Sequence, residues 1–337
     1  MIISRTPFRI SFFGGGTDYP VWFKEHGGAV LATTINKYCY LHCRFLPPFF
    51  EHKFHAVYSK IERTKNIDEI MHPAIRETLR YLEIGRGLSI LYDADIPSKS
   101  GMGSSSSFLV GLLHALSVLR GKKPARKWLA KESINIERGI LKETGGFQDQ
   151  ILAAYGGFNI IEFLPNGEFR IERLALPARR KRELNDRLML FYTGIPRTAA
   201  EVADRYVSGL LKKRQELMRT QELVHLGVTI LKDGGDINRF GELLHEGWMT
   251  KRSLSSHVSN SIIDEVYKKA RGAGAIGGKL LGAGGGGFIL FFVPPERKAD
   301  VRKELKHLTY VPFLFEPSGS KIIGSHLEED YADIEEF

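Results

Sequence analysis

A run of small polar residues stands directly before an apolar segment in the middle of the chain. Residues 97–107 read PSKSGMGSSSS and continue into FLVGLLHALSVL. The first N–H groups of a helix have no partner within it and carry partial positive charge, so such an end binds anions. Gly101 and Gly103 would let the backbone approach phosphate oxygens, and the serines would cap the helix and offer hydroxyls to phosphate or to a metal ion. The alternative is a plain serine-capped core helix, for which one serine is enough.

This pattern predicts a phosphate-binding loop at the start of a buried helix. The residues expected to contact phosphate are Pro97, Lys99, Gly101, Met102, Gly103, Ser104, Ser105, Ser106 and Ser107. No segment matches the Walker A motif, since AGAIGGKL at 273–280 lacks both its first glycine and its final hydroxyl. A G-x-G-x-x-G match in GAGGGG at 282–287 precedes a strand instead of following one, so we interpret it as a close backbone approach and not as a dinucleotide site.

Two other segments carry residues suited to substrate chemistry. PFRISFFGGGTDYP places Arg9 on a strand before a glycine turn and the polar pair Thr17-Asp18, which can meet the hydroxyls of a sugar-like molecule or simply form a capped turn. ERGILKETGGFQDQ places Glu137 on an expected helix and Asp149 after a glycine pair. One carboxylate can hold Mg²⁺ and the other can meet a substrate hydroxyl, although either acid alone is more often a surface residue.

The elements expected around these motifs mix strands and helices without regular alternation, which favours an α+β fold. In the first half we expect strands over 2–13, 29–45, 54–59 and 88–93, helices over 73–84, 105–120 and 124–141, a short helix within GGFQDQILAAYGG, and a hairpin turning at Asn166-Gly167. In the second half we expect strands at 188–192, FILFFV, 311–315 and 320–324, and helices near 198–220, 222–232, 237–248, 261–272 and 296–307. The segment LPARRKRELNDR between them is expected to be a solvated linker, which divides the chain into domains 1–184 and 185–337.

The composition limits the class of protein. A chain of 337 residues with 43% hydrophobic and 26% charged residues is typical of a globular protein, and it has neither a signal-peptide pattern nor a long apolar span, so we expect a cytoplasmic protein without a membrane partner. Cys39 and Cys43 share one strand face, which excludes a disulfide framework and favours buried thiols over a metal site with His42. The net charge of +9 includes RRKR at 179–182, but no aromatic residues alternate with it, so no nucleic-acid partner is expected.

Taken together, the glycine-rich segments resemble the motifs of the GHMP kinases, the superfamily of galactokinase, homoserine kinase, mevalonate kinase and phosphomevalonate kinase. PFRISFFGGGTDY resembles the first motif, IPSKSGMGSSSS the second and KLLGAGGGGFILFF the third, in the family's order and over nearly the whole chain. The resemblance implies an α+β fold of two domains, the first like domain 2 of ribosomal protein S5 and the second ferredoxin-like. It also implies a kinase that uses ATP and Mg²⁺, with residues 101–107 at the triphosphate.

The resemblance also implies roles for individual residues. Asp149 corresponds to the catalytic aspartate, Arg9 to the catalytic arginine, and Ser105 and Glu137 to the Mg²⁺ ligands. The residues placed at the substrate are Gly14, Gly15, Gly16, Thr17, Asp18, Gly284 and Gly285. Galactokinases have Glu-His where this chain has Gly15-Gly16, so their contacts to a galactose ring are not implied here.

Within the family, FFGGGTDY, GSSSSF and GGFQDQ are most similar to kinases of D-glycero-D-manno-heptose 7-phosphate, which implies phosphorylation of the anomeric C1 hydroxyl on the route to GDP-heptose. A sugar phosphate substrate favours a basic pocket, and Arg197 in YTGIPRTA is expected to bind its phosphate or else to be a surface arginine. Two alternatives stay open: a kinase of an unphosphorylated sugar such as fucose, arabinose, galactose or a uronic acid, and a sensor that binds ATP and sugar without chemistry. A homodimer is also left open.

Overall fold

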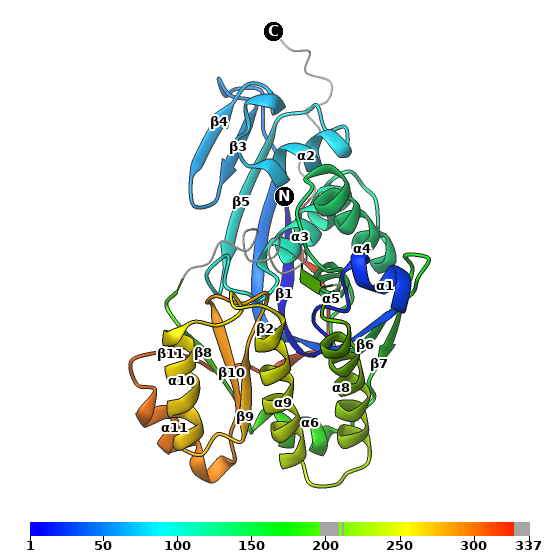
Figure 1. Ribbon diagram of the computed structural model, residues 1–337. Coiled ribbons are helices and arrows are strands. Elements are labelled where there is room, and N and C mark those ends of the chain that lie inside the picture. Colours follow the sequence, from blue (N-terminus) through cyan, green and yellow to red (C-terminus); the bar gives the residue numbers. More distant parts are fainter. Residues whose placement is uncertain (196–208, 211, 327–337) are drawn as a thin grey trace.

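The long strand β2 (Gly28–Phe45) organises the larger of two sheets in the computed structural model, which describes residues 1–195, 209–210 and 212–326 (Figure 1). Along one edge β2 pairs with β1 (Ile2–Phe13), antiparallel over almost its whole length. Along the other edge its first residues pair with β6 (Phe158–Phe163) and its last with β5 (Leu88–Ala94). The predicted strands 2–13, 29–45 and 88–93 are therefore confirmed, and they belong to the sheet that supports the glycine-rich motifs.

The remaining strands of this sheet come from both ends of the chain. They are β3 (Phe54–Val57), β4 (Ile61–Thr64), β7 (Phe169–Arg173), β12 (Phe315–Glu316) and β13 (Lys321–Ser325). β13 pairs with β1 and β12 with β2, so the last described segment returns to the N-terminal sheet. The predicted division at 184/185 assigns these two strands to the second domain, whereas their hydrogen bonds place them in the first sheet.

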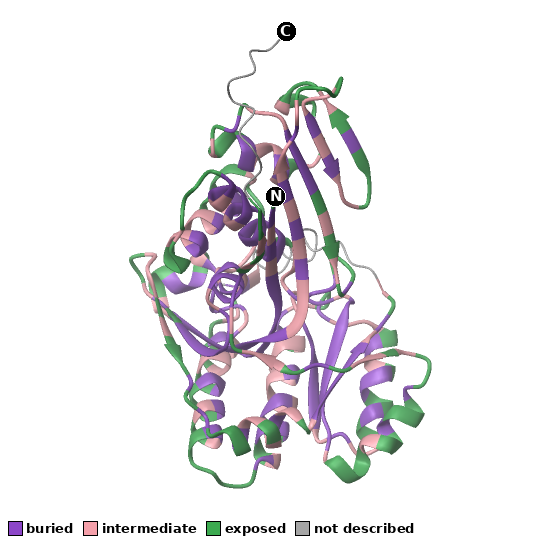
Figure 2. Cartoon of the chain, turned by 180° about the vertical axis from the view of Figure 1, so that it is seen from behind, coloured by how far each residue is buried: buried purple, intermediate pink, exposed green. Residues whose placement is uncertain are grey.

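Helix α3 (Ser104–Leu119) lies at the centre of the N-terminal half and packs on β1 and β2. Its apolar side chains enter two core clusters, one with Phe108 and Leu112 and one with Leu109 and Leu113, so it is buried on nearly every side (Figure 2). Around it lie α1 (Pro20–His26), η1 (Ile67–Glu69), α2 (Pro73–Tyr81), α4 (Arg126–Ile134), the π-helical segment η2 (Asn135–Ile140) and α5 (Gln148–Tyr155). A helix held this firmly gives its first turn a fixed position.

The second sheet has the strand order β11-β8-β10-β9, with all of its pairs antiparallel. Its strands are β8 (Leu188–Tyr192), β9 (Gly277–Leu280), β10 (Phe288–Phe292) and β11 (Thr309–Val311). The described helices of this half are α8 (Arg214–Lys232), α9 (Asn238–Leu254), α10 (Ser261–Gly272), η3 (Pro295–Arg297) and α11 (Lys298–Glu304). In chain order the strands take places 4-1-3-2, the ferredoxin-like arrangement that was expected, and α8 packs on β1 and β2 to join the halves.

Three local predictions differ from the structure. The segment expected as a solvated linker is helix α6 (Ala178–Asn185), because Leu184 is buried and the Arg180 guanidinium donates to the Ile230 carbonyl at 2.7 Å and pairs with Glu183. The break expected between 220 and 222 is absent, since α8 is continuous there. β4 was not predicted, because it is an edge strand whose Ile61 is exposed.

The strand expected at 311–315 is divided between β11 and β12, and the first part of the helix expected near 198–220 lies outside the described residues. Two other expectations are confirmed. Cys39 and Cys43 are buried free thiols, and the hairpin between β6 and β7 turns at Asn166-Gly167. Within the part of the chain that the structure describes, no helix has both the length and the apolar character needed to cross a membrane.

Candidate active site

The loop before α3 presents a helix end that no side chain caps. Gly103 is the N-cap and has a left-handed φ of 76°, and no side-chain hydrogen bond closes the first turn. The serines were expected to cap this helix, but they form its first turn, because the glycine takes the capping position. Ser107 donates to the Pro7 carbonyl at 3.0 Å, while Ser104 accepts from the Lys99 amide at 3.2 Å. The first amides of α3 therefore keep their capacity to bind an anion.

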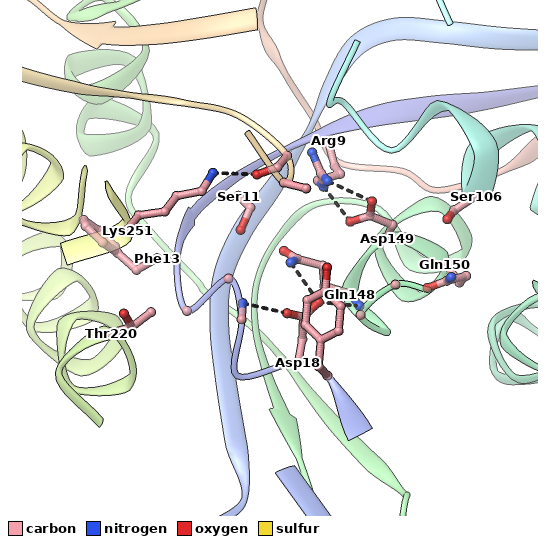
Figure 3. Close-up of a pocket in the computed structure, with 18 of the residues that line it drawn as sticks. Arg9, Ser11, Phe13, Asp18, Ser106, Gln148, Asp149, Gln150, Thr220 and Lys251 are labelled. Carbon is pink, nitrogen blue, oxygen red and sulfur yellow. Dashed lines mark hydrogen bonds and ion pairs between the residues drawn. The ribbon is translucent and has the colours of Figure 1, made fainter. Parts of the chain in front are cut away.

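An arginine–carboxylate pair lies against this loop (Figure 3). Arg9 of β1 donates from Nε to Asp149 Oδ1 at 2.7 Å and from Nη2 to Asp149 Oδ2 at 2.8 Å, while its Nη1 donates to the Gly101 carbonyl at 2.6 Å. The Arg9 backbone amide also donates to the Met102 carbonyl at 3.1 Å. A β-carbon on Gly103 would lie 3.3 Å from Asp149 Oδ2, so the loop and the pair are in contact. The predicted phosphate-binding loop and the predicted catalytic residues Arg9 and Asp149 are thus in direct contact.

Glu137 is a buried acid on the π-helical segment η2, on the other side of the α3 terminus. Its carboxylate accepts from Ser105 Oγ at 3.3 Å, from Ser106 Oγ at 3.1 Å and from the Gln150 amide. Burial, with Glu143 nearby, raises the pKa of Glu137 to about 8. A buried carboxylate beside two hydroxyls is an oxygen-rich site that suits a hard cation. The predicted pairing of Ser105 with Glu137 is present, and Ser106 joins it.

The glycine turn after β1 holds Asp18 at the cleft. Asp18 accepts from the Gly16 amide at 3.0 Å and from Gln148 Nε2 at 2.9 Å. Burial and the neighbouring Asp149 raise the pKa of Asp18 to about 6. Thr17 is fully buried and donates to the carbonyls of Gly14 and Ala29, so it fastens the turn and does not reach the cleft.

The cleft between the two halves gathers part of the predicted site. The predicted residues that line it are Arg9, Gly14, Gly15, Gly16, Asp18, Ser105, Ser106, Glu137 and Asp149. The predicted residues that do not line it are Thr17, Pro97, Lys99, Gly101, Met102, Gly103, Ser104, Ser107, Gly284 and Gly285. Met102 and Ser107 are buried below the loop surface. Arg197 lies outside the described residues.

The glycine-rich third motif joins the two halves. Phe288 donates its amide to the Ser100 carbonyl at 3.1 Å, and a β-carbon on Gly287 would lie 2.1 Å from the same oxygen. Gly285 donates to the Val258 carbonyl at 3.0 Å, which holds that part of the loop against the second half. Close backbone approach therefore accounts for these glycines, as expected for a G-x-G-x-x-G run in the wrong context. Gly282 and Ala283, which were not predicted, are the residues of this loop that line the cleft.

Three further cleft residues were missed in the sequence. Lys279 of β9 donates to the Phe12 carbonyl at 2.6 Å, and burial with the nearby Arg9 lowers its pKa to about 7. Ser11 Oγ and Gln148 Oε1 are buried and have no hydrogen-bond partner within the part of the chain that the structure describes. A lysine inside an apolar strand (KLL) and a glutamine directly before Asp149 were the signals available for two of them.

The geometry suits phosphoryl transfer. An open helix terminus can take a phosphate chain, a carboxylate paired with a guanidinium lies beside it, and a buried acid with hydroxyls flanks it. Phosphoryl transfer depends mainly on positioning and on neutralising charge, and these groups supply both.

Comparison with known proteins agrees with this geometry. The family patterns "GHMP kinases N terminal domain" and "GHMP kinases C terminal" match residues 69–157 and 224–309. A D-glycero-alpha-D-manno-heptose 7-phosphate kinase of Campylobacter jejuni is 30% identical over 344 residues, covering 95% of this chain and 98% of the relative. The solved structure of a D-glycero-D-manno-heptose 1-phosphate kinase from Bacteroides thetaiotaomicron is 26% identical with a TM-score of 0.75, over 97% of this chain and 100% of that chain.

A more distant solved structure shares the fold. Galactokinase of Lactococcus lactis in complex with galactose is 18% identical with a TM-score of 0.74, over 95% of this chain and 94% of that chain. With two family patterns and a relative that matches from end to end, the chain belongs to the GHMP kinases, which are phosphotransferases with an alcohol group as acceptor.

Proposed function

We propose that this protein is an ATP-dependent kinase of the anomeric C1 hydroxyl of D-glycero-D-manno-heptose 7-phosphate, which gives the 1,7-bisphosphate for GDP-heptose synthesis in the cytoplasm. The relative from Campylobacter jejuni, which matches along the whole chain, supports a sugar of this kind. The observation that carries the proposal is the bidentate pair of Arg9 and Asp149 in contact with the loop before α3. This pair is where an acceptor hydroxyl would meet a bound triphosphate.

In this proposal the chain's own groups act in the following way. The amides of the first turn of α3 bind the triphosphate, because they are uncapped and lie at the positive end of a buried helix. Asp149 orients the sugar hydroxyl and accepts its proton as the oxygen attacks the γ-phosphorus. Arg9 orients the Asp149 carboxylate through their ion pair and offsets negative charge as it develops on the transferred group.

Mg²⁺ is the expected partner of ATP, and the donors around Glu137 fit it. Glu137, Ser105 and Ser106 offer oxygen atoms, and within residues 1–195, 209–210 and 212–326 no set of three His, Cys, Asp or Glu side chains competes as a closed metal cage. This agrees with Mg²⁺, which binds through one or two protein oxygens together with phosphates and waters. When bound, the ion neutralises charge between the phosphate oxygens.

A coupled ADP-release assay over heptose 7-phosphate, free heptose and other free or phosphorylated sugars tests the proposal. We expect kcat/KM to be highest for heptose 7-phosphate. Higher kcat/KM for a free sugar would favour the alternative of an unphosphorylated substrate, and no ADP release above background with any sugar would favour a sensor. Arg197→Ala tests the proposed phosphate contact in the same assay, since an unchanged KM for the sugar phosphate would remove Arg197 from that role.

A further inference from the structure

Lys279 has a buried amino group at the cleft, and the described residues provide no anion for it. Its Nζ, which extends from β9 of the second half, donates to the Phe12 carbonyl of the first half at 2.6 Å, and the residue is 8% exposed. Among the described residues no carboxylate forms an ion pair with it, and its charged neighbour Arg9 is itself a cation already paired with Asp149. Burial and the neighbouring Arg9 lower the pKa of Lys279 to about 7, and an anion beside the amino group would favour its charged form. The arrangement therefore points to an anion supplied from outside the chain.

The position of Lys279 along β1 indicates which anion this is. Arg9 is tied to the nucleotide loop through the Met102 carbonyl, whereas Lys279 contacts β1 three residues further along, at Phe12. Three residues of strand span about 10 Å. Along β1, Lys279 therefore lies beyond Arg9 from the loop, in the direction in which the distal end of an acceptor sugar would extend.

Two buried polar atoms line the space between these points. Ser11 Oγ, 6% exposed as a residue, and Gln148 Oε1, 8% exposed, have no hydrogen-bond partner among the described residues and belong to residues that line the cleft. In Figure 3, Ser11 lies between Lys251 and the Arg9–Asp149 pair, and Gln148 lies beside Asp18. A buried hydroxyl and a buried amide oxygen without partners cost free energy unless a ligand satisfies them. Sugar hydroxyls supply the donors and acceptors that they lack.

We propose that Lys279 binds an anionic group of the acceptor sugar, distant from the reacting hydroxyl, while Ser11 and Gln148 bind hydroxyls between the two ends. This inference rests on the proposed kinase function and narrows its substrate class to sugars that carry a phosphate or a carboxylate. It also assigns part of the substrate's recognition to the second half of the chain, so substrate binding bridges both halves through β1 and β9.

Lys279→Met tests the inference, because it removes the charge while keeping an unbranched chain of similar size. The readouts are kcat and KM in the ADP-release assay for ATP, heptose 7-phosphate, free heptose and a uronic acid. We expect KM for the anionic sugar that the wild type uses to rise about 10- to 100-fold, as for loss of a hydrogen bond to a charged group. KM for ATP and for free heptose should stay within about threefold. Lys279→Arg, which keeps the charge, should recover much of the loss.

The outcomes separate this inference from the proposed function. If the wild type prefers a uronic acid or another sugar phosphate over heptose 7-phosphate, the proposed substrate is wrong. The role of Lys279 is then still decided by the Lys279→Met result with the preferred sugar. Equal changes of KM for charged and neutral sugars, or a change of KM for ATP alone, would overturn the inference. If Lys279→Met does not fold, the wild-type panel decides, since neutral sugars used as well as anionic ones would contradict it. Ser11→Ala should raise KM for charged and neutral sugars alike.

Discussion

Asp149→Asn is the substitution with the sharpest expected effect. The carboxylate now accepts from Arg9 Nε at 2.7 Å and from Nη2 at 2.8 Å. Asparagine has one acceptor oxygen, and its amide nitrogen would face a guanidinium N–H, so one of these bonds is lost while the shape is kept. The amide also cannot accept the proton of the sugar hydroxyl. A positioned general base contributes about 10²- to 10⁴-fold, so we expect kcat to fall by about 10²-fold or more.

The assay must separate chemistry from folding and from nucleotide binding. ADP release at saturating ATP and sugar gives kcat, and calorimetric titration with a nonhydrolysable ATP analogue gives the affinity for nucleotide. We expect that affinity to stay within about threefold, because the amides of α3 bind the triphosphate and Asp149 does not. Asp233→Asn is the matched control, since Asp233 is exposed beyond the end of α8 and outside the cleft. Its kcat should equal that of the wild type.

Two results would refute this reasoning about Asp149. A kcat of Asp149→Asn within about fivefold of the wild type would remove it as the group that accepts the proton. A loss of nucleotide affinity as large as the loss of turnover would mean that Asp149 supports the loop and not the chemistry.

Two other predictions address the metal and the N-terminal half. Ser105→Ala and Glu137→Gln should each raise the Mg²⁺ concentration that gives half-maximal activity, because each removes an oxygen from the proposed cation site; unchanged Mg²⁺ titrations would place the ion elsewhere. Burial lowers the pKa of His114 from its ordinary 6.5 to about 4, while its Nδ1 lies 2.9 Å from Ser320 Oγ. Because the unfolded chain binds a proton that the folded chain does not, stability present above pH 6.5 should be lost as the pH falls toward 4, by up to about 3 kcal/mol. Urea unfolding of the wild type and of His114→Gln at pH 7 and at pH 4.5 checks this. If the free energy of unfolding falls between these two pH values by as much in His114→Gln as in the wild type, the prediction is contradicted.

Strong local patterns account for the parts of the fold that the sequence predicts. β1 and β2 are long segments rich in β-branched and aromatic residues, α3 has a long apolar run after its serines, and their predicted bounds agree with the structure to within a residue or two. Helix α6 was missed because three arginines and a lysine dominate its sequence, while burial of Leu184 and Arg180 depends on partners far along the chain. The return of β12 and β13 to the first sheet is also a long-range pairing, which no local pattern encodes.

In the candidate site, too, some features can be predicted from the sequence and others depend on long-range contacts in the fold. The resemblance of the motifs to the GHMP kinases implies that Arg9 acts with Asp149 and Ser105 with Glu137, and the structure brings each pair into contact. The sequence does not predict that the Thr17 hydroxyl forms hydrogen bonds within the turn, because only the fold brings the Ala29 carbonyl to it. Lys279 was missed because it lies in a glycine-rich segment where no strand was predicted, and its contact with Phe12 depends on the packing of the two halves against each other.

The most direct test of the account is a crystal structure of the protein with a nonhydrolysable ATP analogue, Mg²⁺ and the sugar substrate. We expect the β- and γ-phosphates on the first amides of α3, the ion between them and Glu137, and the acceptor hydroxyl within hydrogen-bond distance of Asp149. A triphosphate bound elsewhere, with the α3 terminus free of phosphate, would contradict the central claim that this helix end positions ATP for transfer.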